Sequence, residues 1–255
     1  IGSHVADRLL KRGYHVRVID ALQPRVHPKG KPVWVRPEIE FIQGDVRDKD
    51  AMGRAMDGVE IVSHQAAYQD YMPDFSTFIS TNATSTALIM ELIVEKKLDV
   101  RKVVVASSQA AYGEGNYTCA EHGSFEAKGR PLPQLERAEW EMKCPVCGRD
   151  CENLLLEERM HNPNNAYALS KLLEEMTALR LGRLHGIPAA ALRYSITQGP
   201  RQSLYNSYSG VCRIFSLKLL HDQAPIIYED GLQRRDYVHI ADVVEPVARC
   251  VIGQQ

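Results

Sequence analysis

The sequence of 255 residues predicts an α/β fold built on a doubly wound parallel sheet. Three observations support this prediction. Short apolar runs typical of buried strands alternate with longer segments in which apolar residues recur at helical spacing. The hydrophobic share of 44% and the charged share of 25% are ordinary for a globular protein. The length suffices to bury a full core in one large domain, or in one domain with a small appendage.

Charge and hydropathy argue against several classes of partner. The formal net charge is −1, which disfavours a nucleic acid or an anionic membrane as the main partner. We find no apolar run that approaches the roughly 18 residues needed to span a bilayer. No basic and then apolar secretory leader opens the chain. We therefore expect a cytoplasmic protein with no membrane partner.

Strands and helices are expected in regular alternation. Val5, Leu9 and Leu10 mark a first helix, and the run at 15–20 indicates a strand after it. The Pro- and Lys-rich stretch 23–37 is expected to be a loop. The chain opens on the entry to a helix and stops just after another, so we expect both termini to be truncated. The remaining predicted elements are strands at 40–42, 60–63, 102–106 and 189–194, and long helices at 75–97 and 163–185.

Tyr167 and Lys171 form the most informative pair in the sequence. They lie four positions apart on a predicted helix, so they project from the same face. A phenol titrates at a pH of about 10, and a neighbouring ammonium group favours its charged form. With a hydroxyl donor from elsewhere, the pair can remove a proton from a substrate alcohol while hydride leaves the same carbon. The alternative is a surface pair on an amphipathic helix.

Gly2 and Asp20 match half of a dinucleotide-binding fingerprint. A Gly at the start of the first helix lets that helix pack closely and directs its N-terminus at a pyrophosphate. Asp20 closes the next strand, where it would accept hydrogen bonds from ribose hydroxyls and repel a 2′-phosphate. The pair therefore favours NAD over NADP.

Further motifs follow in a fixed order along nearly the whole chain. With Ile1-Gly2-Ser3-His4 at the start, they resemble the extended short-chain dehydrogenases/reductases, the UDP-glucose 4-epimerase-like family of NAD-dependent nucleotide-sugar epimerases and dehydratases. The other motifs are Gly44-Asp45-Val46-Arg47-Asp48, His64-Gln65-Ala66-Ala67, Asn82, Ser107-Ser108-Gln109-Ala110-Ala111-Tyr112-Gly113, Tyr167-x-x-x-Lys171, Gly199-Pro200-Arg201-Gln202, and Asp230-Gly231 with Arg235-Asp236-Tyr237-Val238-His239.

The resemblance implies three regions and a cofactor site. The regions are a Rossmann-type NAD-binding domain at 1–194 without its first strand, an insertion at 115–155, and a substrate-binding region at 195–255 that is incomplete at its C-terminus. The long helices at 75–97 and 163–185 resemble the pair that forms the homodimer interface in this family. The cofactor contacts that the resemblance implies are Gly2, Asp20, Asp45, Val46, His64, Ala66, Asn82, Tyr167 and Lys171.

The same resemblance assigns catalytic roles. Ser108 would hydrogen-bond the reacting sugar hydroxyl, Tyr167 would be the acid and base, and Lys171 would hold the nicotinamide ribose and favour the phenolate. The expected reaction is NAD-dependent epimerisation of a nucleotide-diphosphate sugar through a transient keto-sugar. Gln109 and Ala110 stand where 4,6-dehydratases carry an Asp-Glu pair, which disfavours a dehydratase.

Two other functions stay open from the sequence. One is a nucleotide-sugar dehydrogenase or reductase that releases NADH. The other is a non-catalytic dinucleotide-binding sensor, against which the intact set of Ser108, Tyr167 and Lys171 argues.

Substrate contacts follow from two arginines. Arg235 matches the family Arg that grips the nucleotide diphosphate, and Arg201 lies in the Gly-Pro-Arg segment. Ser195-Ile196 replaces the Phe-Asn that relatives usually carry before that segment, so one substrate contact of the family is missing.

Four cysteines gather in the insertion between Ser108 and Tyr167. Cys119, His122, Cys144 and Cys147 form two knuckles that fit a tetrahedral structural zinc site, with Cys151 as a substitute for His122. Metal binding would fold a segment too short to bury its own core. A redox Cys-x-x-Cys and unpaired inert cysteines are the alternatives. By position, the zinc-ribbon-like insertion should stand over the substrate cleft.

Overall fold

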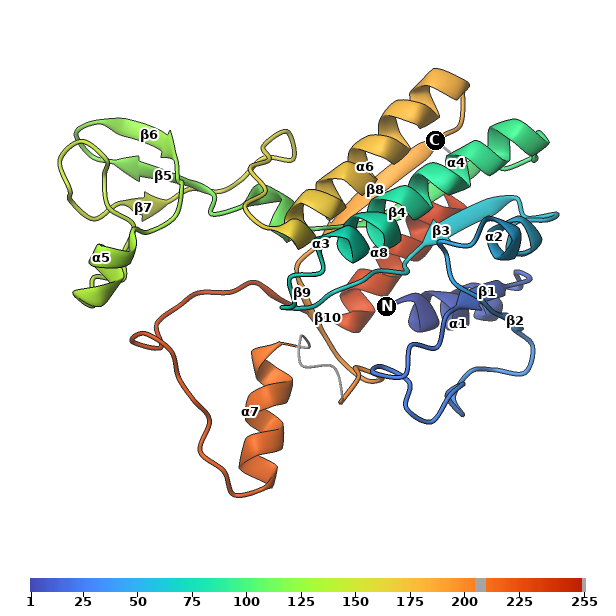
Figure 1. Ribbon diagram of the computed structural model, residues 1–255, viewed down its shortest axis with the longest axis horizontal. Helices are drawn as coiled ribbons and strands as arrows, with labels where there is room; N and C mark the ends of the chain where they lie inside the picture. Colours follow the sequence, from blue (N-terminus) through green and yellow to red (C-terminus); the bar gives the residue numbers. More distant parts are fainter. Residues whose placement is uncertain (205–209, 254–255) are drawn as a thin grey trace.

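Three parallel strands form the centre of the molecule (Figure 1). The structure is a computed structural model that describes residues 1–204 and 210–253. Strand β4 (Lys102–Ser108) lies between β3 (Ile61–His64) and β8 (Ala189–Tyr194), and both neighbours run parallel to it. The predicted α/β class is confirmed.

Side chains of β4 alternate between two cores, and this explains its run of valines. Val103 and Val105 pack with the first core, which is formed with α4 (Ser85–Lys96) and α6 (Ala166–His185). Val104 points to the opposite face and packs with Val5 and Val247 of α1 (Gly2–Lys11) and α8 (Ile240–Ile252). All three valines are fully buried. A strand covered on both faces is apolar at every position instead of at alternate ones.

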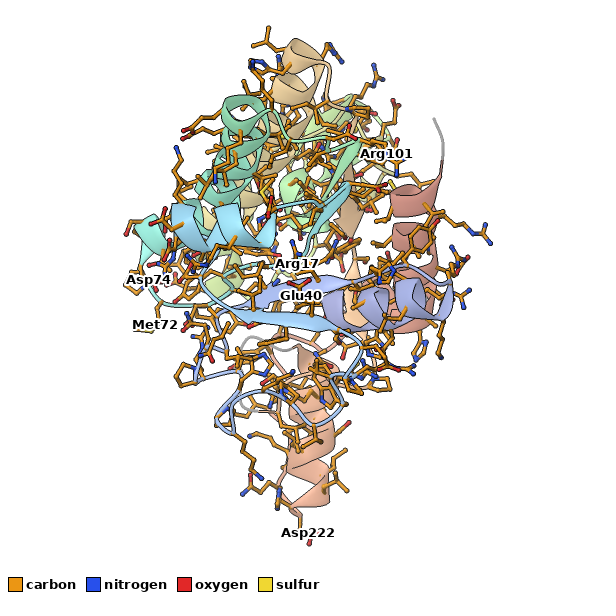
Figure 2. All side chains as sticks on the ribbon, turned by 90° about the vertical axis from the view of Figure 1, so that its right-hand side faces the viewer. Arg17, Glu40, Met72, Asp74, Arg101 and Asp222 are labelled. Atoms are coloured by element: carbon orange, nitrogen blue, oxygen red, sulfur yellow. The ribbon has the colours of Figure 1, made fainter. Side chains whose placement is uncertain are left out.

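A second parallel pair lies beside this sheet. Strand β1 (Arg17–Asp20) pairs with β2 (Glu40–Gln43), and an ion pair of 2.8 Å joins Arg17 to Glu40 across the two strands (Figure 2). Helix α2 (Lys49–Ala55) follows, capped by the Asp48 side chain. Among the described residues β1 and β3 do not pair, so the parallel strands are divided between sheets where one continuous sheet was predicted.

The helix predicted at 75–97 contains an irregular middle. It consists of α3 (Phe75–Phe78), a π-helical segment η1 (Ile79–Thr84) and α4. Residues Phe75–Lys96 are long and apolar enough to cross a membrane, contrary to the expectation from the sequence, and half of the apolar window is buried inside the protein. Asn82, Ser85 and Thr86 are fully buried and hydrogen-bonded, as in a core helix. π-Segments occur often at functional sites.

The insertion is a separate antiparallel sheet that projects from the main body (Figure 1). Strand β5 (Asn116–Cys119) pairs with β6 (Gly123–Glu126) on one side and with β7 (Glu152–Asn153) on the other. A short helix α5 (Leu132–Glu136) lies between β6 and β7 in the chain. Three cysteines of the insertion, Cys119, Cys144 and Cys151, form its small core with Tyr117 and Phe125.

The C-terminal region extends away from the sheet. Strand β9 (Ile196–Gln198) pairs in parallel with β10 (Tyr237–His239), and α7 (Val211–Leu220) lies between them in the chain. Figure 2 shows α7 as a projection, with Asp222 just beyond its end. A long segment without helix or strand, 221–236, returns from α7 to β10.

Gly113 fixes the junction between β4 and the insertion. It follows the 3-10 helix η2 (Gln109–Tyr112) and has a φ of 67°, in the left-handed region. A Cβ atom at this position would lie 1.9 Å from the backbone oxygen of Asn162. Asn162 also donates its backbone N–H to Ala111 O, so the segment before α6 rests directly on this turn.

We expect Gly113→Ala to lower the free energy of unfolding by about 2–3 kcal/mol, because the left-handed conformation and the steric contact both oppose a side chain. Gly58→Ala is the matched control, since Gly58 has the same φ of 67° and no atom within 4 Å of the added Cβ. Urea unfolding measures both variants. Equal losses in the two variants would contradict the steric argument.

Candidate active site

Helix α6 holds Tyr167 and Lys171 in its first turns. Asn165 precedes the helix, and its side chain accepts a hydrogen bond of 2.9 Å from the backbone N–H of Ala168. Gly186 ends the helix in a left-handed conformation. Because α6 packs on β4, β8 and η1, Lys171 is 2% exposed while Tyr167 is half-buried at the rim.

Lys171 has a buried acidic partner that the sequence reasoning missed. Its Nζ lies 2.7 Å from Oε2 of Glu174, a residue that is fully buried. Burial raises the pKa of Glu174 to about 7, and the Lys171 charge opposes that shift. Among the described residues, the other carboxylate oxygen of Glu174 has no hydrogen-bond partner. The spacing of three positions on a helix was the available signal.

Gln69 donates a hydrogen bond of 2.7 Å from Nε2 to the phenol oxygen of Tyr167. Gln69 lies in the loop after β3, where Arg25 Nη2 donates to its backbone oxygen at 3.0 Å. The side chain of Asn82 bonds to both the N–H and the carbonyl oxygen of Tyr68, which fixes the same loop. A donor on the phenol oxygen favours the phenolate. No sequence motif marks Gln69, so this contact was not predicted.

Ser107 and Ser108 end β4 and point to different partners. The Oγ of Ser108 accepts a hydrogen bond of 3.1 Å from Ala110 N and so caps η2. The Oγ of Ser107 donates to Glu175 at 2.7 Å, and Glu175 is paired in two places with Arg193 at 2.9 and 2.8 Å. This buried network ties the ends of β4 and β8 to α6, and it keeps the Ser108 turn against the helix that carries Tyr167.

The side chain of Gln109 makes a structural hydrogen bond. Its Oε1 accepts a hydrogen bond of 2.9 Å from Ser195 Oγ, and Ser195 also lies 2.6 Å from Asp236 O. Ser195 occupies the position where the resemblance implies a Phe. Its hydroxyl connects η2 to the residue before β10.

Six of the nine predicted cofactor residues lie at or just after the ends of β1, β2 and β3 and at the start of α1, while Asn82 lies in η1 and Tyr167 and Lys171 lie on α6. A Cβ atom on Gly2 would lie 3.3 Å from Gln65 Cβ, so the helix start approaches the loop after β3 closely. Asp20 Oδ1 accepts from Leu22 N at 2.7 Å at the end of β1. Arg47 pairs with Asp45 and lowers the pKa of that carboxyl group. This close, glycine-dependent start of a helix beside strand ends fits a bound dinucleotide.

Besides Lys171, four of the predicted cofactor residues are largely withdrawn into the protein. Val46 and Ala66 pack with the first core. His64 is 4% exposed and its Nε2 lies 2.8 Å from Ser85 Oγ. Asn82 is fully buried and donates to Ser170 Oγ at 2.8 Å. Direct contact of His64 or Asn82 with a cofactor would require these bonds to open, so the geometry gives both residues a positioning role.

The structure does not bring the two predicted substrate arginines together. Arg201 bonds to Asp7 of α1 at 2.7 Å and stacks over Trp34, with 4.7 Å between the guanidinium carbon and the ring centroid. Substrate binding by Arg201 would require it to leave these partners. Arg235 is exposed in the segment before β10, and its Nη1 bonds to Arg234 O at 2.7 Å.

The side chains of Cys119, His122, Cys144 and Cys147 converge in the insertion, with their ligand atoms within 4.8 Å of one another. Cys119 Sγ lies 3.7 Å from Cys147 Sγ and 3.6 Å from His122 Nδ1, and Cys144 Sγ lies 3.7 Å from the same nitrogen. Tetrahedral zinc with its usual bond lengths gives S–S edges of about 3.8 Å and S–N edges of about 3.6 Å. A disulfide would need about 2 Å.

These three distances match the edges of a tetrahedral zinc site. Cys151 is buried and donates to Arg149 O at 3.6 Å. It is not among the four converging residues, which include His122.

The buried His64 predicts acid sensitivity. Burial, with the Lys171 charge second, lowers its pKa from 6.5 to about 3. As the pH falls, an unfolded His binds its proton first, so the free energy of unfolding decreases from about pH 6.5 towards pH 3. We expect His64 to contribute a loss of about 2 kcal/mol between pH 7.5 and pH 5.

Urea unfolding of the wild type and of His64→Asn at the two pH values measures this contribution. The difference between their pH slopes isolates His64, and the exposed His221 provides the control variant His221→Asn. Identical slopes for wild type and His64→Asn would show that the imidazole does not resist protonation.

Comparisons with known proteins agree with this geometry. The family model "NAD dependent epimerase/dehydratase family" matches residues 1–132 and 145–251, and the gap lies in the insertion. A Methanocaldococcus jannaschii protein, provisionally named UDP-glucose 4-epimerase, is 34% identical over 96% of this chain and 68% of its own length.

Solved structures show the same fold. A Thermotoga maritima UDP-glucose 4-epimerase with UDP-glucose has a TM-score of 0.74 at 26% identity, covering 98% of this chain and 70% of the other. A Thermus thermophilus UDP-glucose 4-epimerase in complex with NAD has a TM-score of 0.72 at 25% identity, covering 100% and 72%. The chain therefore belongs to the NAD-dependent epimerase/dehydratase family.

Proposed function

We propose that this protein epimerises a nucleotide-diphosphate sugar with NAD, through a transient keto-sugar. The observation that carries the proposal is the placement of Ser108 at the end of β4 beside α6, the helix that presents Tyr167 and buries Lys171. Relatives named as 4-epimerases support carbon 4 of the sugar as the inverted centre.

The protein's own groups would handle the proton. The Tyr167 phenolate takes the proton from the sugar hydroxyl and becomes the neutral phenol, and both the Lys171 ammonium and the Gln69 amide would stabilise the phenolate before the transfer. Ser108 orients the hydroxyl. Bound NAD supplies the hydride acceptor for oxidation and the donor for the return step. Gln109 and Ala110 carry no carboxylate, so this site has no group in that position to eliminate water.

The cofactor would lie along the ends of the parallel strands. Gly2 admits the pyrophosphate close to the start of α1, and Asp20 accepts from the ribose hydroxyls. Asp45 would contact the adenine, and Lys171 the nicotinamide ribose. Arg235 would bind the diphosphate of the sugar nucleotide.

A structural zinc ion would hold the insertion together. Cys119, His122, Cys144 and Cys147 would bind it in a closed tetrahedral site with no open position for chemistry.

The chain would divide into the three regions expected from the sequence. These are 1–194 for the cofactor, 115–155 for the insertion and 195–255 for the substrate.

The assembly we propose is a homodimer in the cytoplasm. Exposed apolar side chains on α3, η1, α4 and α6 would form the interface. Sedimentation velocity at micromolar concentration tests this proposal, and a monomer in that experiment would contradict it. None of the six cysteines, all of which lie in the described part of the chain, forms a disulfide, as is usual in a reducing compartment. The exposed large apolar residues on these helices are Phe75, Ile79, Val94, Leu169, Leu173, Leu179 and Leu184.

The reaction is tested by incubating the whole protein with NAD and a panel of UDP-, GDP- and dTDP-sugars. We expect a new sugar isomer in the proton NMR spectrum without accumulation of NADH absorbance. Tyr167→Phe should lower the rate at least about a thousandfold, because the acid and base is removed. NADH build-up with an oxidised sugar would instead show a dehydrogenase, and no reaction with any sugar would favour the sensor.

The Gln69 contact predicts a smaller effect on the same reaction. Gln69→Leu should lower kcat about tenfold, because one hydrogen bond to the charged phenolate is worth about 1–2 kcal/mol. Gln223→Leu, at an exposed position outside the site, is the control. An unchanged kcat in Gln69→Leu would show that the amide does not act on Tyr167.

Metal content tests the zinc site directly. Dialysed protein should carry one zinc ion per chain by plasma mass spectrometry, and Cys144→Ser and Cys147→Ser should lose it because each removes a ligand. Cys212→Ser is the matched control, since Cys212 is an exposed free thiol on α7. Full zinc content in Cys144→Ser would contradict the assigned ligand set.

A further inference from the structure

An ion pair joins the insertion to the segment that carries Arg235. Arg130, between β6 and α5, presents two nitrogens to the two carboxylate oxygens of Glu229, and both distances are 3.0 Å. The side chains are 26% and 20% exposed, so the pair is partly shielded from water. Parallel two-point pairing of this kind fixes orientation as well as distance.

Arg130 is held in place by the backbone that leads to the metal site. Its Nη1 also donates to Trp140 O at 2.8 Å. Gln134, which is 6% exposed, donates to the backbone oxygens of Glu139 and Glu141 at 2.8 and 2.7 Å. These bonds order the stretch just before Cys144, so the arginine's position depends on how the metal-binding insertion is folded.

Glu229 adopts a backbone conformation that a Glu resists. Its φ is 54°, in the left-handed region that costs a residue with a side chain about 1–2 kcal/mol. The turn continues with Gly231 N bonded to Tyr228 O and Leu232 N bonded to Asp230 Oδ1. A Gly would fit this position without strain, so the presence of Glu points to a use for its carboxylate, and Arg130 is the partner.

The other end of this segment is also anchored. Asp236 O accepts from Ile196 N at 3.1 Å and from Ser195 Oγ at 2.6 Å, which connects it to β9. Arg235 therefore lies between one anchor on the insertion and another on the body of the protein. Its own side chain is exposed, and one of its nitrogens, Nη1, bonds to the neighbouring Arg234 O.

We propose that the metal-binding insertion positions the substrate-binding segment, with Arg130 and Glu229 as the positioning residues that place Arg235 for a nucleotide diphosphate. The inference rests on the proposed function for the identity of the ligand. The mechanical link between the insertion and the segment stands on the contacts alone.

The first test measures steady-state kinetics with the sugar nucleotide identified by the panel. Arg130→Gln and Glu229→Gln should each raise KM about tenfold while kcat stays within about twofold and NAD affinity is unchanged. The double variant should be no worse than either single one, because both remove the same contact. Arg137→Gln is the control, since Arg137 pairs locally with Glu139 inside the insertion.

The second test needs no substrate and so separates this inference from the proposed function. Trypsin cleaves after Arg234 and Arg235, and mass spectrometry identifies those cuts. We expect both cuts to occur at least about fivefold faster in Arg130→Gln than in untreated wild type, and likewise in wild type stripped of metal by a chelator. Arg137→Gln should be cut at the wild-type rate. Cleavage as slow in Arg130→Gln as in wild type, or a KM unchanged in both single variants, would overturn the proposal. If the wild type shows no activity but Arg130→Gln is still cut faster, the contact between the insertion and the segment would be supported. Only the proposed nucleotide-diphosphate ligand would then be refuted.

Discussion

The burial of the Lys171 charge constrains the whole active site. An ammonium group withdrawn from water is costly unless it is paired, and Glu174 supplies the pair from the next turn of α6 at 2.7 Å. The arrangement requires α6 to lie tightly on β4 and β8, and Ala178, Val103 and Val105 provide that packing. The same packing brings Tyr167 to the rim beside the end of β4, where Ser108 stands. Helix α6 therefore supplies both the proposed catalytic residues Tyr167 and Lys171 and part of the hydrophobic core.

A second layer of contacts holds the acid and base from the opposite side. The π-helical segment turns Asn82 inward, where it bonds to Ser170 on α6 and to the backbone of Tyr68. The loop after β3 then places Gln69 on the phenol oxygen. Asn82 thus acts through the loop. A residue that a family motif associates with the cofactor can serve the site by fixing the backbone that surrounds it.

Much of the fold could be predicted from the sequence, because the patterns that indicate it are local. The valine run of β4 indicates a buried strand, and the ligand spacing of the cysteines and His122 predicts a metal site. The contacts missed from the sequence, Gln69 with Tyr167 and Arg130 with Glu229, join residues 98 and 99 positions apart. No periodicity or motif encodes such pairs, because they depend on how loops close over the sheet.

Transfer of hydrogen within the site is the claim on which the functional account depends. The most direct measurement uses the sugar nucleotide identified by the panel, labelled with deuterium at the carbon whose configuration changes, in ordinary water. The account predicts an epimer that keeps its deuterium at that carbon, because the hydrogen leaves and returns without meeting solvent. Loss of the deuterium to water would contradict it and would require inversion by proton exchange at carbon instead.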